Sequence, residues 1–187
     1  MVYVATATAG DAEMAERIAM HRAQRSAAWQ TLELPTGIAE GVAAALRGGL
    51  PDAGDAATSV IDGPSSTPNG FDTPSARMTI ILEDLTFLLS NLMAGDSVSD
   101  DDSTYAEATA RNDASARAEA TAIAEVKALL ALSADIILVS NEVGMGLVPP
   151  YPLGRRFRDA LGRLNQFAAS SCGEVYVLFA GLPLQLK

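Results

Sequence analysis

The chain has 187 residues, 49% of them hydrophobic and 19% charged, which supports one packed domain spanning residues 1–187 and excludes wholesale disorder. Its net charge of −10 argues against a non-specific nucleic-acid binder, because the average surface would repel phosphates. No apolar run approaches the roughly 20 residues of a membrane span, and the single cysteine, Cys172, is expected to be a small buried thiol, so we expect a cytoplasmic protein.

Short apolar runs alternate along the chain with segments of helical periodicity. The runs are continuous, which is typical of parallel strands buried on both faces. We predict strands at Val2–Ala5, Thr79–Leu82, Asp135–Val139 and Glu174–Phe179. We predict helices at Asp11–Arg25, Gly37–Arg47, Thr86–Met93, Glu107–Leu132 and Gly154–Ser170. This alternation indicates an α/β fold with a mostly parallel sheet and helices on both faces.

Two segments break the pattern, and we predict that both are solvated loops. Residues 48–77 are rich in Gly, Pro, Ser, Asp and Thr, and residues 94–115 contain many small polar side chains. The run Asp100–Asp102 makes a calcium loop conceivable, but the segment lacks the central glycine and the alternating ligands of an EF-hand.

Ligands of parallel sheets bind at the carboxyl ends of the strands, which directs attention to the loops after Ala5, Leu82 and Val139. Glu83 and Asp84 follow the second of these strands, where P-loop enzymes place the acid that holds Mg²⁺. Asp84 fits equally well as the N-cap of the next helix, whereas for Glu83 we favour a functional role.

The segment Ser140–Pro149 follows the third of these strands and contains two glycines separated by one residue. Backbone amides at such glycines can approach a phosphate. The segment lacks the third glycine and the ribose-binding acid of a dinucleotide fingerprint, so as a generic motif it is weak.

His21 is the only histidine of the chain and lies on the first predicted helix. It follows Met14 and Ile18 along one stripe, so we expect it at the edge of the core-facing side. Arg17 and Arg25 lie four residues before and after it on nearly the same face, where they suit the phosphates of a nucleotide. A lone histidine among arginines is more often an ordinary surface residue, and the helix alone leaves both interpretations open.

Motifs in one fixed order decide between these interpretations. They are Tyr3-Val4-Ala5-Thr6, Asp11-x-Glu13-Met14-x-x-Arg17-Ile18-x-x-His21-Arg22-x-x-Arg25, Trp29-x-Thr31-x-Glu33, Leu85-Thr86, Ser90-Asn91-Leu92, Ser140–Pro149, Phe157-Arg158-Asp159-x-x-Gly162-Arg163-Leu164-Asn165-Gln166 and Ala180-Gly181-Leu182-Pro183-Leu184. With these motifs the chain resembles the adenosylcobinamide kinase / adenosylcobinamide-phosphate guanylyltransferase family of cobalamin synthesis. The resemblance covers nearly the whole chain outside the two loops.

The resemblance implies a RecA-like, P-loop-type fold, a homotrimer and two reactions. One reaction phosphorylates adenosylcobinamide from a nucleoside triphosphate, ATP or GTP. The other transfers GMP from GTP onto adenosylcobinamide phosphate through a guanylated histidine, which corresponds to His21. The acid at the strand end that binds Mg²⁺ corresponds to Glu83. The nucleotide contacts of the family fall on Ala5, Thr6, Ala7, Arg22, Ala23, Gln24, Arg25, Glu33 and Glu83.

The chain departs from the family pattern at its beginning. Family members start with a strand and a Gly-rich loop ending in Gly-Lys-Ser, about one βα unit before the position of Met1, and the 187 residues contain no Gly-x-x-x-x-Gly-Lys-[Ser/Thr]. The family's Asp-Cys-Leu-Thr reads Glu83-Asp84-Leu85-Thr86, and its Arg-Pro reads Arg25-Ser26. We therefore expect Val2–Ala5 to expose an unpaired edge, and the chain to fold weakly and to bind little GTP.

Two hypotheses account for this departure. One is a cobinamide kinase and guanylyltransferase whose recorded sequence starts late, and the other is a non-catalytic relative that binds a corrinoid or assembles without turnover. The coding sequence upstream of Met1 would separate them. A P-loop kinase of another substrate is disfavoured, because His21 and Ser140–Pro149 would then have no role.

Overall fold

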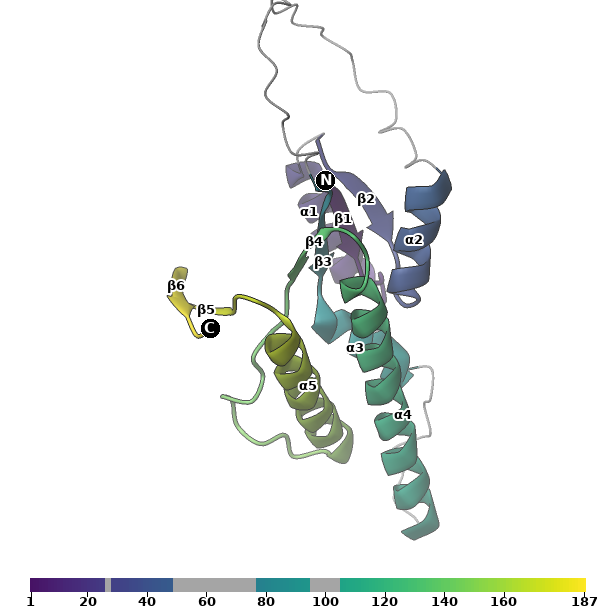
Figure 1. Ribbon diagram of the computed structural model, residues 1–187. Helices are drawn as coiled ribbons and strands as arrows, with labels where there is room; N and C mark the ends of the chain where they lie inside the picture. Colours follow the sequence, from purple (N-terminus) through teal and green to yellow (C-terminus); the bar gives the residue numbers. More distant parts are fainter. Residues whose placement is uncertain (26–27, 49–76, 95–104) are drawn as a thin grey trace, which may run out of the picture.

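The computed structural model describes residues 1–25, 28–48, 77–94 and 105–187 (Figure 1). The strands are β1 (Val2–Ala5), β2 (Gln30–Glu33), β3 (Thr79–Glu83), β4 (Asp135–Leu138), β5 (Tyr176–Phe179) and β6 (Leu182–Gln185). The helices are α1 (Ala12–Gln24), α2 (Ile38–Gly48), α3 (Leu85–Ala94), α4 (Tyr105–Leu130) and α5 (Pro152–Ser171). The predicted α/β class with a mostly parallel sheet is confirmed, and each predicted helix ends within two residues of the observed one.

Four strands form a parallel sheet in the order β2-β1-β3-β4. In this register Val4 of β1 lies opposite Leu32 of β2 and Leu82 of β3. The expectation that β1 would expose an edge is wrong, because β2, a short strand with little apolar signal, pairs with it. Among the described residues β4 is the last strand on the other side, and its Ile137 is 49% exposed.

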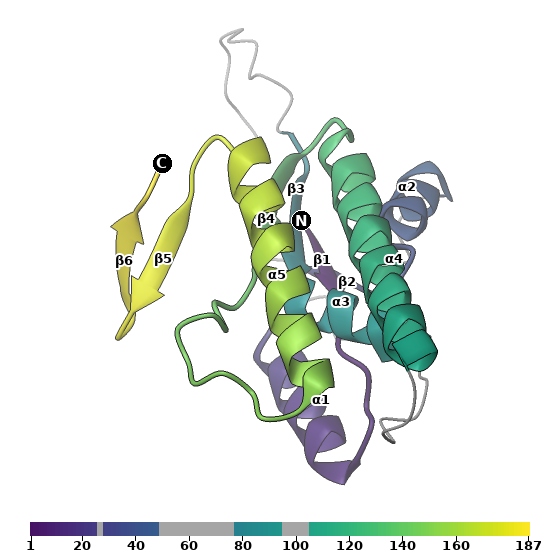
Figure 2. The same ribbon diagram turned by 90° about the horizontal axis from the view of Figure 1, so that it is seen from below.

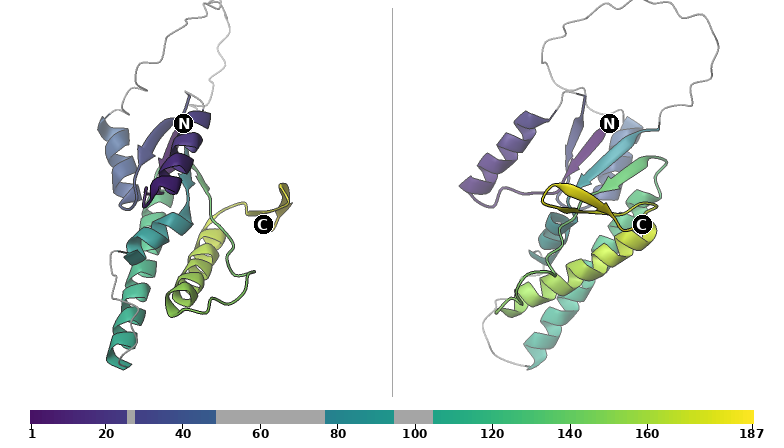
Figure 3. Two further views of the ribbon diagram at one scale, coloured as in Figure 1. Left: turned by 180° about the vertical axis from the view of Figure 1, so that it is seen from behind. Right: turned by 90° about the vertical axis from the view of Figure 1, so that its left-hand side faces the viewer.

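Helices lie on both faces of this sheet, but they are distributed unequally. Right-handed crossovers place helices on opposite faces when successive steps run in opposite directions along the sheet. The step from β1 to β2 runs against the steps from β2 to β3 and from β3 to β4. As a result, α1 lies on one face, and α2 and α4 lie on the other (Figure 1, Figure 3). Helix α5 packs against α3 and α4.

Alternate residues of β1 and β3 therefore have different surroundings. On the side covered by α2–α5, which we call the packed face, four side chains are fully buried: Val2, Val4, Ile80 and Leu82. On the opposite side, which we call the α1 face, the side chains are only partly buried: Tyr3, Ala5, Ile81 and Glu83. The prediction of strands buried on both faces holds only for the packed face, because α1 has no buried residue of its own.

The long helix α4 organises the packed face. It buries a stripe with a spacing of three or four residues, which defines one face of a helix: Ala114, Ala118, Ala122, Val126 and Leu129. Glu125 of the same helix accepts hydrogen bonds from the backbone amides of Gly37, at 3.0 Å, and Ile38, at 2.9 Å. Because these amides belong to the start of α2, the carboxylate satisfies donors that the helix itself leaves unpaired.

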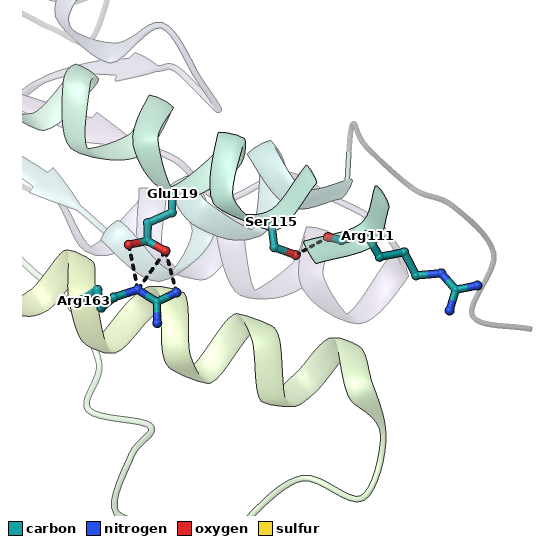
Figure 4. A network of polar contacts seen from close by, with 4 residues as sticks. All are labelled: Arg111, Ser115, Glu119 and Arg163. Carbon is teal, nitrogen blue, oxygen red and sulfur yellow. Dashed lines mark hydrogen bonds and ion pairs between the residues drawn. The ribbon is translucent and has the colours of Figure 1, made fainter. Parts of the chain in front are cut away.

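Arg163 fixes α5 to α4 through a forked ion pair with Glu119 (Figure 4). Its Nε donates to one carboxylate oxygen at 2.8 Å and its Nη2 donates to the other at 2.7 Å. The planar guanidinium matches a carboxylate in this arrangement. Helix α5 also buries a stripe of its own: Ala160, Leu161, Leu164 and Ala168.

The predicted loop at residues 94–115 is wrong in its second part. Residues 105–115 belong to α4, because alanine is the strongest helix former and Ala114 is buried against the core. The rest of that prediction, residues 95–104 with the calcium alternative at Asp100–Asp102, lies outside the described residues. The same holds for residues 49–76 of the first predicted loop.

The C-terminal part differs most from the sequence-based expectation. The predicted buried parallel strand Glu174–Phe179 is β5, which pairs antiparallel with β6 in a hairpin apart from the four-stranded sheet (Figure 2). Ala180 and Gly181 turn the chain with φ of 51° and 78°, the geometry that a two-residue hairpin favours. Cys172, expected to be buried, is only partly buried at the end of α5.

Candidate functional site

The loops after β1, β3 and β4 meet at the carboxyl edge of the sheet, as predicted for a ligand site. Thr6, directly after β1, is fully buried. Its Oγ1 donates to the carbonyl oxygen of Asp84 at 2.8 Å and accepts from the amide of Asp84 at 2.7 Å. The Oδ2 atom of Asp84 accepts from Nδ2 of Asn141, beyond the end of β4, at 2.9 Å. Side chains thus join all three loops.

Asp84 belongs to the framework of this edge. Its Oδ1 accepts a hydrogen bond from the amide of Phe87 at 2.8 Å, which confirms the interpretation as an N-cap of α3. Burial raises the pKa of Asp84 above its ordinary value, and the hydrogen bonds from Phe87 and Asn141 lower it less. Because the carboxyl group is buried and already bonded on both oxygens, it holds the loops together.

Glu83 lies on the α1 face beside Tyr3. The Tyr3 hydroxyl donates to Oε2 of Glu83. Burial, together with this hydrogen bond, raises the pKa of Tyr3 to about 12, so the hydroxyl remains a donor at neutral pH. The arrangement orients the carboxylate, and among the described residues no hydrogen bond engages its other oxygen, Oε1, which suits a further ligand.

Arg25, the C-cap residue of α1, packs on the same tyrosine. Its guanidinium carbon lies 3.8 Å from the centre of the Tyr3 ring, within the range of a cation–π interaction. Its Nη1 donates to Oγ1 of Thr31 on β2 at 3.3 Å. Trp29 meets the Tyr3 ring edge-on, with the ring centres 6.5 Å apart. Tyr3 therefore links the end of α1 to Glu83.

His21 lies in the last turn of α1 with its side chain exposed. Met14 and Ile18 are the partly buried residues of this helix, so the histidine follows the stripe that the sequence indicates. The next residue, Arg22, forms an ion pair with Glu33 at the end of β2, and both of these side chains are more than half exposed. An exposed imidazole next to a cation can meet a phosphate that approaches from solvent.

The predicted site residues fall into two groups in the structure. The first group lies on α1 or beside the α1 face: His21, Arg22, Ala23, Gln24, Arg25, Glu33 and Glu83. The second group lies at the end of β1 and in the loop after it: Ala5, the last residue of the strand, and Thr6 and Ala7. In that loop Thr6 is fully buried, so its side chain supports the loop and leaves its neighbours at the surface.

The roles of Tyr3 and Asn141 are not apparent from sequence reasoning. An aromatic residue in an otherwise aliphatic strand is the one signal that marks Tyr3. Asn141 stands out only as a polar residue at the end of a strand.

The acidic groups of the described segments do not by themselves form a metal cage, because no three His, Cys, Asp or Glu side chains among them gather in a suitable cluster. Mg²⁺ in nucleotide sites is commonly held by one or two carboxylates together with phosphate oxygens and water. The oriented carboxylate of Glu83 suits the role of such a Mg²⁺ ligand. Within the described residues, no helix is both long enough and apolar enough to cross a membrane.

Comparison with known proteins places this chain in a family. The sequence matches the family described as cobinamide kinase / cobinamide phosphate guanyltransferase over residues 1–49 and 57–186. It is 35% identical over 185 residues to the bifunctional adenosylcobalamin biosynthesis protein CobP of Pseudomonas aeruginosa, across 99% of this chain and 81% of that protein.

Two enteric relatives are similar over the whole chain. The chain is 30% identical to the bifunctional adenosylcobalamin biosynthesis protein CobU of Escherichia coli over 190 residues and to that of Salmonella typhimurium over 187 residues. Each match covers 100% of this chain and 86% of the relative. The match to the family includes every predicted site residue. The chain therefore belongs to the cobinamide kinase / cobinamide phosphate guanyltransferase family.

Proposed function

We propose that this chain phosphorylates adenosylcobinamide and transfers GMP from GTP to adenosylcobinamide phosphate, with His21 as the nucleophile. Family membership supports the two activities. The assignment of residues rests on the α1 face, where His21 is exposed and two arginines follow it at the C-terminal end of the same helix. Arg22 forms an ion pair with Glu33. Arg25 packs on Tyr3, whose hydroxyl donates to Glu83.

The guanylyl transfer proceeds in two displacements at the same phosphorus. A ring nitrogen of His21 attacks the α-phosphorus of GTP, the bond from this phosphorus to the bridging oxygen breaks, and pyrophosphate leaves. A phosphate oxygen of adenosylcobinamide phosphate then attacks the α-phosphorus, and the nitrogen–phosphorus bond breaks. The products are adenosylcobinamide-GDP and free His21.

The cations of the α1 face suit the charge on the nucleotide. Arg25 lies over Tyr3 with its guanidinium partly buried, where a phosphate interaction is less screened than in bulk water. Arg22 is paired with Glu33 in an exposed position, so an incoming phosphate can replace the carboxylate at little cost. The remaining positions that we propose as nucleotide contacts are Ala5, Thr6, Ala7, Ala23, Gln24 and Glu33.

Glu83 is the residue that we propose for Mg²⁺. When bound, Mg²⁺ would neutralise negative charge on the phosphate oxygens. Tyr3 holds one oxygen of the carboxylate, which reduces the number of orientations that the acid can adopt. The homotrimer stays a prediction that the family resemblance suggests, and the cytoplasmic location stays one that the single cysteine suggests.

Transfer of label from GTP to the protein tests the function. With GTP labelled at the α-phosphorus, we expect an acid-labile phosphoramidate on the chain joined to the strand and Gly-rich loop of a relative, where GTP binding is expected, and none on the same protein with His21→Ala. Met20→Ala is the matched control, because Met20 is the neighbouring residue on α1 and is 52% exposed. Both substitutions alter exposed side chains and should leave folding unchanged.

Two other outcomes of the labelling experiment would contradict the proposal. Label that persists in His21→Ala would overturn the choice of nucleophile. A joined protein with His21 intact that takes up no label but still binds adenosylcobinamide would support the second hypothesis, a non-catalytic relative.

A further inference from the structure

Asn165 of α5 contacts the loop after β4 with both ends of its side-chain amide. Its Nδ2 donates to the carbonyl oxygen of Asn141 at 3.1 Å, and its Oδ1 accepts from Oγ of Ser140 at 2.6 Å. A side chain that bonds two consecutive residues with a donor and an acceptor restrains both the position and the orientation of that segment.

Asn141 passes this restraint on to the loop after β3. Its Nδ2 donates to Oδ2 of Asp84 and to Oγ1 of Thr86, each at 2.9 Å. Asp84 is in turn bonded through its backbone to Thr6. A continuous set of hydrogen bonds therefore runs from Asn165 across the carboxyl ends of β4, β3 and β1.

The anchor of this network is rigid, because α5 is held on two sides. Leu161 and Leu164 are fully buried in the core of the packed face. Arg163 forms the forked ion pair with Glu119 of α4 (Figure 4). Asn165 directly follows these residues and projects from a helix that cannot easily rotate.

We propose that Asn165 is a positioning residue for the nucleotide site. It acts through Ser140 and Asn141 to hold the segment 139–151 and the acidic turn at Glu83 in one arrangement. The predicted effect on catalysis rests on the proposed function. The predicted effect on the order of residues 139–151 does not depend on any activity.

Asn165→Asp tests the structural part without any activity. The substitution keeps the shape and an acceptor for Ser140, but it replaces the donor to Asn141 with an oxygen that repels the carbonyl. We expect amide hydrogen exchange in residues 139–151 to become roughly three- to tenfold faster, the loss that one hydrogen bond of ordinary strength produces. Exchange in β1 and β3 should stay unchanged.

Gln166→Glu is the matched control, because it makes the same amide-to-carboxylate change at the next, exposed position of α5. It should not alter exchange in residues 139–151. Ser140→Ala is the second test if Asn165→Asp folds poorly, because it removes one of the two bonds from an exposed position and should accelerate exchange in the same segment.

The catalytic part is measured as the rate of guanylation of the protein at saturating GTP and Mg²⁺. We expect Asn165→Asp to lower this rate roughly tenfold or more while KM for GTP changes less than about twofold, because a misplaced group reduces the rate more than binding. Gln166→Glu should match the wild type in both values.

The outcomes separate this proposal from the proposed function. Unchanged exchange in residues 139–151 would overturn the positioning role whether or not the protein is active. Faster exchange with an unchanged guanylation rate would overturn its catalytic consequence. An inactive wild type would count against the proposed function, and the exchange measurement would still decide whether Asn165 holds the loop.

Discussion

The packed face and the α1 face belong to the same strands but are held by different interactions. On the packed face, Val4 and Leu82 are fully buried beneath α2–α5, and burial of apolar surface is the main source of stability. On the α1 face, Tyr3, Glu83 and Arg25 make polar and cation–π contacts beneath a helix with no buried residue. The packed face therefore supplies most of the stability. The α1 face carries polar groups whose present contacts a ligand can replace.

The difference also bears on dynamics. A helix that buries few apolar groups and is held by exposed ion pairs opens at lower cost than the core, because such pairs contribute little stability. Helix α1 has this character, and it carries the proposed nucleophile. A nucleotide that bridges Arg22 and Arg25 would supply contacts that this helix lacks, so we expect binding to order α1 more than any other helix.

Two neighbouring residues of β3 provide the strongest test of the contrast. Leu82 points into the packed face and is fully buried, whereas Ile81 lies on the α1 face and is partly buried. We expect Leu82→Ala to lower the free energy of unfolding by about 3 kcal/mol and Ile81→Ala by about 1 kcal/mol, because the cost of a truncation depends on the cavity it leaves. Urea titration measures both, and equal losses would contradict the difference between the faces.

A smaller effect is expected from Tyr3→Phe, which keeps the ring beneath Arg25 and removes the hydroxyl that binds Glu83. We expect a loss of about 1 kcal/mol in the free energy of unfolding, because the acceptor is a carboxylate and the pair is partly buried. Tyr176→Phe is the matched control. Its hydroxyl donates to Glu174 at 2.8 Å in the exposed hairpin, and its removal should cause no measurable change.

Much of the packed face can be predicted from the sequence, because its signals are local. Continuous apolar runs identify β1, β3 and β4, and a period of three to four residues identifies the helices. The strand β2 is missed because Gln-Thr-Leu-Glu has a single strongly apolar residue. The hairpin of β5 and β6 is misplaced because its apolar residues give the same local signal as a buried strand, and only pairing between distant segments distinguishes the two.

The candidate site is less predictable for the same reason. His21 is identified through the order of motifs in the whole chain, since its own helix leaves two interpretations open. The bond between Tyr3 and Glu83 joins residues 80 positions apart, and the bond between Asn141 and Asp84 spans 57 positions. Which side chains meet depends on the register of parallel strands, and a single sequence does not specify that register.

The ion pair between α4 and α5 and the ion pair between α1 and β2 should differ in coupling energy. Glu119 is only 15% exposed in its pair with Arg163, whereas Arg22 and Glu33 are 57% and 52% exposed. A double-mutant cycle with Glu119→Gln and Arg163→Gln should give a coupling of about 0.5–1 kcal/mol, because a forked pair on two packed helices loses little side-chain entropy. The corresponding cycle for Arg22 and Glu33 should give no measurable coupling. Coupling of similar size in both cycles would mean that α1 is held as firmly as α5.

The smallest predicted effect concerns Asp84, which lies where the two faces meet at the carboxyl edge. Burial raises the pKa of its carboxyl group above the ordinary value of 3.8, so the folded state binds this proton more tightly than the unfolded state. The contribution of Asp84 to the free energy of unfolding should therefore fall as the pH rises from 3.8 through the raised pKa, and then level off. Asp84→Asn cannot titrate. The stability of the wild type relative to this variant should consequently decline over that window, and by less than the other effects, because the hydrogen bonds from Phe87 and Asn141 offset part of the effect of burial.

Urea unfolding of both proteins at several pH values between about 3.5 and 7 measures this difference. Asp11→Asn is the matched control, because Asp11 also caps a helix, with its Oδ1 accepting from the amide of Met14 at 2.8 Å, but does so in an exposed position. Substitution at this exposed position controls for the loss of a capping carboxylate itself. A relative stability of the wild type that rises with pH would show that the hydrogen bonds from Phe87 and Asn141 outweigh burial. Asp84 would then be a carboxylate stabilised by its charge, in the manner expected of a ligand-binding acid, and the assignment of framework and ligand roles to Asp84 and Glu83 would have to be reversed.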